Sequence, residues 1–448
     1  MDATTYFLLA ALLALVFIGV EIAICLGTIS ILALMISTAD AEVTLNFLGS
    51  TGYEVLRDYL FAVIPLFILM GAFIARSGAA SDLFWAVDRG LKRLPGRLAH
   101  ATVVGNVLFG FVTGTSLAAA TTFTSIAYPQ MKRYGYSQTF PLGLIAGSAC
   151  LGMLIPPSLL LVIWAILTDQ SIGQLFLAGI LPGFSLAALM ILYIVAVSIV
   201  RPDVVGHGTS EHVTQRKDSA QRAGGGHKTP SATDLCISGV GFVAIILGAL
   251  VGIWLGIFTP TEGAGIGALI ALVLGIVKGM RWNDIQEAVL ETARSATPIL
   301  AIVFAAQLYS RTLAMSGIGR TIEAAMLGTG FGVVGIVLMM ISIWFVLGML
   351  IDSISIMLLT VPIFAPVATS LNLDPMVFAM VGVLTIEAGL LTPPFGINVY
   401  AVRSVANEPG VTMGAIFQHV TPYWIMLLLL VPLMFAFPAI VTFLPRAF

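Results

Sequence analysis

The sequence predicts an all-α polytopic membrane protein built from inverted-topology repeats, each with a re-entrant helical hairpin and a proline-broken span. Three observations support this fold class. Of 448 residues, 59% are hydrophobic and only 9% are charged, with a mean hydropathy of +1.05, which is too apolar for a soluble globule. Basic residues gather at a few boundaries between apolar runs. Two proline pairs interrupt apolar segments at equivalent places in the two halves.

Several apolar runs are long enough to cross about 30 Å of hydrocarbon. They cover residues 61–75, 139–168, 172–200, 235–258, 259–277, 295–315, 375–405 and 421–443. An earlier run at residues 5–38 is too long for one straight helical span, and it is short for two. The number of helices in this first run therefore stays open.

The basic residues predict the orientation of these runs. Fourteen of the twenty Lys and Arg residues lie in four segments, at residues 76–97, 132–133, 201–228 and 278–281. The positive-inside rule makes these segments cytoplasmic. The run at 101–127 has basic residues on both sides, so we expect a re-entrant hairpin with both ends inside. The run at 329–371 is followed by no positive charge, and we expect a second hairpin that opens to the outside.

The predicted organisation has five parts. They are N-terminal scaffold helices (1–60), a first inverted repeat (61–200), a polar, glycine-rich cytoplasmic linker (201–234), connecting scaffold helices (235–281) and a second inverted repeat (282–448). The proline-broken spans lie at about 139–168 and 375–405. The second repeat starts with an amphipathic stretch, residues 282–294, that we expect to lie along the cytoplasmic interface.

One constant offset in residue number aligns the two halves without a gap. It places Pro156-Pro157 on Pro393-Pro394, Pro129 on Pro366, Ser116 on Ser353 and Leu154 on Leu391. Because the predicted topology runs the two copies in opposite senses, the repeat is inverted. Inverted repeats with broken helices in corresponding positions are typical of secondary transporters, whose sites lie near the midplane between the halves.

The proline breaks suggest a chemistry. A broken helix frees backbone carbonyl oxygens, which are hard ligands suited to Na⁺, and it points half-helix N-termini at anionic groups. The hairpin tips, residues 110–116 and 347–353, bring small, hydroxyl and acidic residues to the same depth. If each tip faces its own break, the sequence predicts two sodium sites with one substrate site between them.

Seven motifs together are typical of one family. They are PLFILMGAFIARSG (65–78), YPQMKRYGY (128–136), IPPS (155–158), SIGQLFLAGILPG (171–183), TPTEGAGIGAL (259–269), LGMLIDS (347–353) and LLTPPFG (390–396). With them the chain resembles the large membrane subunit (DctM-type permease) of tripartite ATP-independent periplasmic (TRAP) transporters. The resemblance implies an elevator-type, Na⁺-driven importer of small organic carboxylates in the bacterial inner membrane. It also implies two partners, a small four-helix membrane subunit and a soluble periplasmic substrate-binding protein.

The resemblance also assigns site residues. It implies a first sodium site at Thr113, Thr115, Gly152, Ile155 and Pro157. It implies a second at Gly348, Gly389, Thr392 and the carbonyl of Phe395. One feature departs from the family pattern. The usual serine-glycine-serine tip, followed by an alanine-rich stretch with aspartate, is here Thr113-Gly114-Thr115-Ser116 followed by LAAAT, so the hydroxyls are kept and the aspartate is absent.

The candidate substrate-binding residues lie at the tips and beyond the second break. They are Thr115, Ser116, Asp352, Ser353 and Arg403. Each has a simpler interpretation: the hydroxyls could bond to preceding carbonyls, Asp352 could be an N-cap, and Arg403 could extend to the interface. Glu387 also flanks the second break, with no role assigned.

Two other functions need to be considered. A stand-alone Na⁺- or H⁺-coupled dicarboxylate or citrate symporter would have a related architecture but need no binding protein. An intramembrane hydrolase would need a nucleophile with a base or metal ligands, and neither hairpin carries a histidine or a pair of acids. We therefore expect a transporter in contact with the lipid bilayer, with no enzymatic activity and no nucleic-acid partner.

Overall fold

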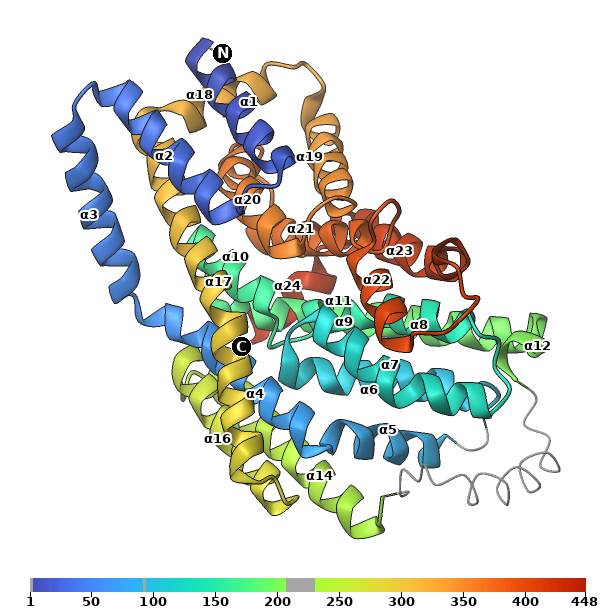
Figure 1. The fold of residues 1–448 in the computed structure, drawn as a ribbon. Helices are drawn as coiled ribbons and strands as arrows, with labels where there is room; N and C mark the ends of the chain where they lie inside the picture. Colours follow the sequence, from blue (N-terminus) through green and yellow to red (C-terminus); the bar gives the residue numbers. More distant parts are fainter. Residues whose placement is uncertain (1–2, 92–93, 207–229) are drawn as a thin grey trace.

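The computed structural model describes residues 3–91, 94–206 and 230–448, and in this part of the chain all regular structure is helical (Figure 1). Among these described residues, eight helical segments are long and apolar enough to cross a membrane. The predicted class of all-α polytopic membrane protein is thus confirmed. Most of the predicted linker, residues 207–229, lies outside the described residues.

The described chain begins with the helices α1 (Ala3–Ile18), α2 (Ile22–Thr38) and α3 (Ala41–Arg57). The apolar run at 5–38 therefore forms two helices, of 16 and 17 residues, and not one span. Gly19 lies between them with a φ of +90°, a conformation that glycine adopts without steric cost. This turn answers the question that the length of the run left open.

The first half continues with η1 (Tyr59–Ala62), α4 (Val63–Ser77) and α5 (Ala79–Gly90). Helices α6 (Arg97–Thr113) and α7 (Ser116–Arg133) pack against each other as a hairpin, with only Gly114 and Thr115 between them. An interrupted helix follows, made of α8 (Phe140–Ala149), α9 (Leu151–Leu154) and α10 (Leu159–Thr168), with its break at residues 155–158. Helices α11 (Ile172–Val200) and α12 (Pro202–Val205) end this half.

The second half begins with α14 (Ala232–Ile245), the π-helical η2 (Ile246–Val251), α15 (Gly252–Trp254), α16 (Pro260–Val277), α17 (Trp282–Ser316) and α18 (Ile318–Leu327). A second hairpin is formed by α19 (Gly332–Gly348) and α20 (Ser353–Ser370). A second interrupted helix is formed by α21 (Pro375–Gly389) and α22 (Ile397–Ala406). The chain ends with α23 (Met413–Ala436) and α24 (Ala439–Ala447).

The amphipathic stretch at 282–294 does not form a separate interfacial helix. It joins the following span in α17, a continuous helix of 35 residues that contains Pro298. Its acidic face is used within the protein, because Arg76 on α4 pairs with Glu287 at 2.5 Å and with Glu291 at 2.8 Å. The stretch is thus the first part of α17, with two acidic residues paired to a neighbouring helix, and its place at the cytoplasmic interface stays a prediction.

The predicted last span, 421–443, is wrong in its bounds. Helix α23 begins earlier, at Met413, where the Thr412 side chain accepts a hydrogen bond from the backbone of Ala415 and caps the helix. It ends at Ala436, because the residue before Pro438 is disfavoured in a helical conformation. Residues beyond this point form the short helix α24.

Aromatic rings join the two halves of the chain. Trp164 of α10 lies 6.1 Å from Trp344 of α19, between ring centroids, and Phe378 of α21 contacts both. The indole N–H of Trp344 donates to Thr360 of α20 at 2.7 Å.

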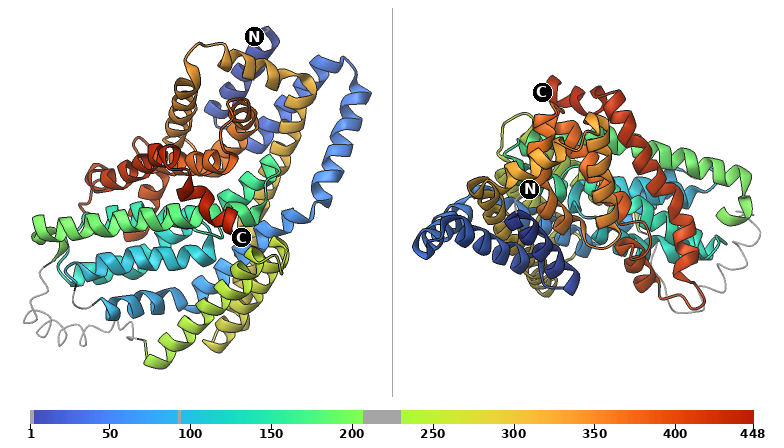
Figure 2. Two further views of the ribbon diagram at one scale, coloured as in Figure 1. Left: turned by 180° about the vertical axis from the view of Figure 1, so that it is seen from behind. Right: turned by 90° about the horizontal axis from the view of Figure 1, so that it is seen from above.

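Two views show the hairpins and interrupted helices gathered on one side of the molecule, with α3, α14, α16 and α17 along the other (Figures 1 and 2).

Helix α8 approaches α23 too closely for a side chain at Gly147. A Cβ added there would lie 2.3 Å from Cγ of Tyr423, a fully buried ring. We therefore expect Gly147→Val to destabilise the purified protein in detergent by about 1–3 kcal/mol, seen as a lower Tm. Gly414→Ala on α23 is the control, because its Cβ would meet nothing within 4 Å. Equal Tm values for the two variants would contradict this packing.

Candidate functional site

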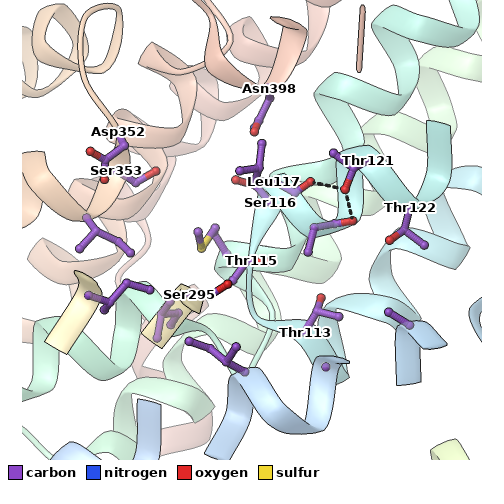
Figure 3. Close-up of a pocket in the computed structure, with 18 of the residues that line it drawn as sticks. Thr113, Thr115, Ser116, Leu117, Thr121, Thr122, Ser295, Asp352, Ser353 and Asn398 are labelled. Atoms are coloured by element: carbon purple, nitrogen blue, oxygen red, sulfur yellow. Dashed lines mark hydrogen bonds between the residues drawn. The ribbon is translucent and has the colours of Figure 1, made fainter. Parts of the chain in front are cut away.

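A cavity of about 480 Å³ lies between the two hairpin tips and helices α4 and α17 (Figure 3). Its walls include four of the predicted substrate-binding residues: Thr115, Ser116, Asp352 and Ser353. Gly71 and Ala75 of α4 and Ser295 of α17 form the opposite wall. We call this cavity the central pocket. The structure thus brings together most of the predicted substrate-binding residues, and they come from both halves of the chain.

Both hairpins present a helix N-terminus to the central pocket. Helix α7 starts at Ser116 and α20 starts at Ser353, and both residues line it. The backbone N–H groups of a first turn carry partial positive charge. Asp352 caps α20, since its carboxylate accepts from the backbone N–H of Ser355 at 3.0 Å. Asp352 therefore forms the N-cap contact, and it also lines the central pocket.

The first tip lies directly on the first proline break. Gly114, at φ +62°, accepts a hydrogen bond from the backbone of Leu159 at 3.1 Å, and an added Cβ there would come within 2.3 Å of the Pro157 oxygen. A Cβ on Gly152 would lie 3.2 Å from the Thr115 oxygen. This contact gathers carbonyl oxygens at one point inside the protein.

The first set of predicted sodium ligands is grouped around this contact. The Thr113 hydroxyl donates to Phe109 O at 3.0 Å, so it bonds to a preceding carbonyl, and Thr113 also lines the central pocket. Ile155 lies in the break with an extended backbone, and its side chain packs on Gly183 of α11. Only the backbone of Ile155, and not its side chain, is therefore free to act as a ligand in the break.

The second tip contacts the second break through two glycines. A Cβ on Gly348 would lie 2.7 Å from Cα of Gly389, and a Cβ on Gly389 would lie 2.6 Å from Cα of Gly348. Thr392 donates to Gly389 O from both its backbone N–H (2.9 Å) and its hydroxyl (2.6 Å). Phe395 is half exposed, and its side chain lines a separate cavity beside α1, so only its backbone belongs to the break.

Arg403 is not brought to the central pocket. It lies in the last turn of α22, where its Nε donates to Val411 O at 3.0 Å. Nearby, Lys132 at the end of α7 donates to Glu408 at 2.6 Å. This hydrogen bond holds the pKa of the Glu408 carboxyl below its ordinary value. The contact ties the base of the first hairpin to the segment that follows α22.

Sequence reasoning missed Asn398, in the first turn of α22. It is 1% exposed and lines the central pocket, and neither amide atom has a hydrogen-bond partner among the described residues (Figure 3). Buried amides without partners are uncommon in proteins, because leaving them unpaired is costly. Its position, shortly after the Pro393-Pro394 pair at the start of a half-helix, was the signal available in the sequence.

The charges of the pocket are acidic. Asp352 and Glu291 line it, and no Lys or Arg is found among its lining residues in the described part of the chain. Glu291 is already paired with Arg76, at 2.8 Å. The other polar groups of the lining are hydroxyls and one amide: Thr113, Thr115, Ser116, Thr121, Thr122, Ser295, Ser353 and Asn398.

Interrupted helices, paired hairpins and a pocket that carries hydroxyl, amide and carboxyl groups in an apolar helical bundle define a membrane transporter. The family model "Tripartite ATP-independent periplasmic transporter, DctM component" matches residues 9–440, and the chain belongs to this family.

Its relatives support the assignment. The C4-dicarboxylate TRAP transporter large permease protein of Pseudomonas aeruginosa is 31% identical over 88% of this chain and 86% of its own length. The ectoine TRAP transporter large permease protein of Halomonas elongata is 29% identical over 98% of both chains. The sialic acid TRAP transporter large permease protein of Vibrio cholerae is 27% identical over 97% of both.

A solved structure has the same fold at low sequence similarity. The Alcanivorax borkumensis YdaH transporter superimposes with a TM-score of 0.61 over 98% of this chain and 99% of its own, at 15% identity. The chain is therefore an inner-membrane permease, and its relatives are permeases rather than enzymes. Large permeases of this family work with a small membrane subunit and a periplasmic binding protein, which makes the chain part of a binding-protein-dependent secondary transporter.

We predict that Asn398 contacts the substrate. Asn398→Leu removes an amide without removing a hydrogen bond of the described fold, so the Tm should be unchanged or higher. The KM for uptake should rise about tenfold, because a substrate group loses its partner. Asn106→Leu is the contrasting variant, since Asn106 donates to Ser148 at 2.7 Å and its loss should lower the Tm. An unchanged KM in Asn398→Leu would exclude the contact.

Proposed function

We propose that the chain imports a small organic carboxylate together with Na⁺. It would receive the substrate from a periplasmic binding protein and work with a small four-helix membrane subunit. The observation that carries this proposal is the composition of the central pocket: two helix N-termini and a set of hydroxyls, with no basic side chain in the described lining. A carboxylate there needs its charge balanced by N–H groups, hydroxyls and a bound cation.

The tip–break contacts supply the proposed cation sites. The first groups oxygens of Thr113, Thr115 and Pro157, and the second groups those of Gly389 and Thr392. Uncharged oxygen ligands suit a hard cation such as Na⁺. Sodium at either contact would fix the tip against its break. The helix N-termini would then be held in place for the substrate, which couples the two binding events.

The same contacts support an internal repeat, which the predicted topology makes an inverted one. In each half, a hairpin tip meets the following interrupted helix through a glycine, Gly152 in the first half and Gly389 in the second. These two glycines are related by the same offset that places Pro156 on Pro393. Each half thus has a close contact between its hairpin tip and a glycine of its interrupted helix, as expected of a duplicated unit.

The position of the central pocket fits an elevator mechanism in its inward-facing state. On α17 the pocket contacts residues 291–299, close to the predicted cytoplasmic end, and a separate polar cavity of about 380 Å³ contacts Gln307 and Arg311 near the opposite end. For outward access, the hairpins and interrupted helices would move as one body along α4 and α17 toward that second cavity.

The pocket also limits the substrate class. Asp352 and the surrounding hydroxyls favour a carboxylate that also carries hydrogen-bond donors, such as hydroxyl or amino groups. The relatives described above are named for C4-dicarboxylates, ectoine and sialic acid. A stand-alone symporter is disfavoured, because members of this family work with a binding protein.

The proposal is tested by uptake into proteoliposomes that contain this chain and its small subunit. We expect uptake of the binding protein's ligand only with that binding protein outside and an inward Na⁺ gradient. Sodium-independent uptake would contradict the ion sites, and uptake without the binding protein would favour the stand-alone symporter. A potassium gradient of equal size is the control for membrane potential.

A further inference from the structure

Arg76 lies at the edge of the central pocket and binds two carboxylates. It is in the last turn of α4, next to Ala75, which lines the pocket. Its Nε and Nη2 both donate to Oε2 of Glu291 on α17, at 3.2 and 2.8 Å, and its Nη1 donates to Oε2 of Glu287 at 2.5 Å. A guanidinium has five donors in a fixed plane, so it can hold both carboxylates at once.

The two glutamates differ in their relation to the pocket. The lining residues of α17 are Glu291, Ser295 and Ile299, and because they are four residues apart they share one face of the helix. Ser295 belongs to the wall opposite the hairpin tips (Figure 3). Glu287 lies one turn earlier on α17 and is not a lining residue. Arg76 therefore pairs with one carboxylate inside the lining and one outside it.

Both acidic residues of the lining are thus paired with a group of the protein. Asp352 accepts from the backbone N–H of Ser355 in the first turn of α20, at 3.0 Å, where the helix dipole offsets its charge. Glu291 accepts from Arg76. A carboxylate substrate would be repelled by an acid that lacked such a partner. The pocket can accept an anion because each of its own acids is balanced.

We propose that Arg76 is a specificity-determining residue. By pairing with Glu291 it neutralises the charge that α17 brings to the central pocket, and this makes the wall opposite the tips compatible with an anionic substrate. Without Arg76, this wall would attract cations and repel anions. The inference rests on the proposed function, since it concerns an anionic substrate, and it adds a residue that belongs to neither tip and neither break.

The test measures the charge of the pocket with a thiol reporter at residue 295. Ser295→Cys is combined with Cys236→Ser, because Cys236 is exposed whereas Cys25 and Cys150 are buried. In the purified complex of large and small subunits, the modification rate of this thiol is measured with an anionic, a cationic and a neutral methanethiosulfonate reagent. The reporter lies about 6 Å along the helix from Glu291, which is within the Debye length of about 10 Å at 0.1 M salt.

Arg76→Gln should lower the ratio of the anionic to the cationic rate about threefold or more, because one carboxylate of the lining loses its cation. The neutral rate should stay the same, which shows that the thiol is equally accessible. Arg76→Lys keeps the charge and should leave the ratio close to that of the reporter alone. High salt should reduce the difference between Arg76→Gln and the reporter alone.

Two double variants separate the charge of the pocket from the total charge of the cluster. Arg76→Gln with Glu291→Gln and Arg76→Gln with Glu287→Gln have the same net charge, but only the first removes a carboxylate from the lining. The first should restore the ratio, and the second should restore it much less. Arg311→Gln is the control for the loss of a cation elsewhere on α17, because Arg311 pairs with Glu54 at a separate cavity.

An unchanged ratio in Arg76→Gln, or equal restoration by the two double variants, would overturn the inference. The labelling requires neither substrate nor sodium. A failure of the proposed import would therefore appear in the uptake assay, and a failure of this inference would appear in the ratio of labelling rates.

Discussion

The structure depends on how two breaks in apolar helices satisfy their backbone groups. Inside a bilayer there is no water for a free carbonyl or amide, so an interrupted helix is tolerated only where protein covers the break. Here a hairpin tip covers each one. Gly114 approaches Pro157 in the first half and Gly348 approaches Gly389 in the second, so closely that a methyl group at Gly114, Gly348 or Gly389 would collide with backbone atoms. These contacts place two helix N-termini and the surrounding hydroxyls around one pocket.

The two halves are similar in their backbone and different in their side chains. Thr115 in the first tip corresponds to Asp352 in the second, and Cys150 corresponds to Glu387. Backbone oxygens recur at both breaks, whereas these acidic groups come from the second half alone. We propose that the backbone oxygens, which recur at both breaks, bind two identical ions. The side chains that differ between the two halves can then recognise one asymmetric substrate.

Local signals in the sequence predicted most of the fold and part of the site. Proline pairs, the lengths of apolar runs and the positions of charged residues are visible within short stretches of sequence. They predicted the membrane class and the region of the central pocket. Contacts between distant segments carry no such signal. The sequence around residue 282 does not show that α17 is one continuous helix. Its acidic residues Glu287 and Glu291 pair with Arg76, which lies far earlier in the chain. Asn398 follows the second proline pair, but only the fold shows that its buried amide lines the pocket, and Arg403 bonds to a loop that follows its own helix.

We propose that each tip–break contact binds one sodium ion. Equilibrium binding of radioactive sodium to the purified large and small subunits tests it most directly, without any need for transport. We expect two ions per large subunit, and one in a variant with Thr113→Val and Thr115→Val, which removes hydroxyls from the first contact only. Gly389→Val should likewise leave one, by displacing the second tip. No saturable binding, or two ions in each variant, would contradict the claim.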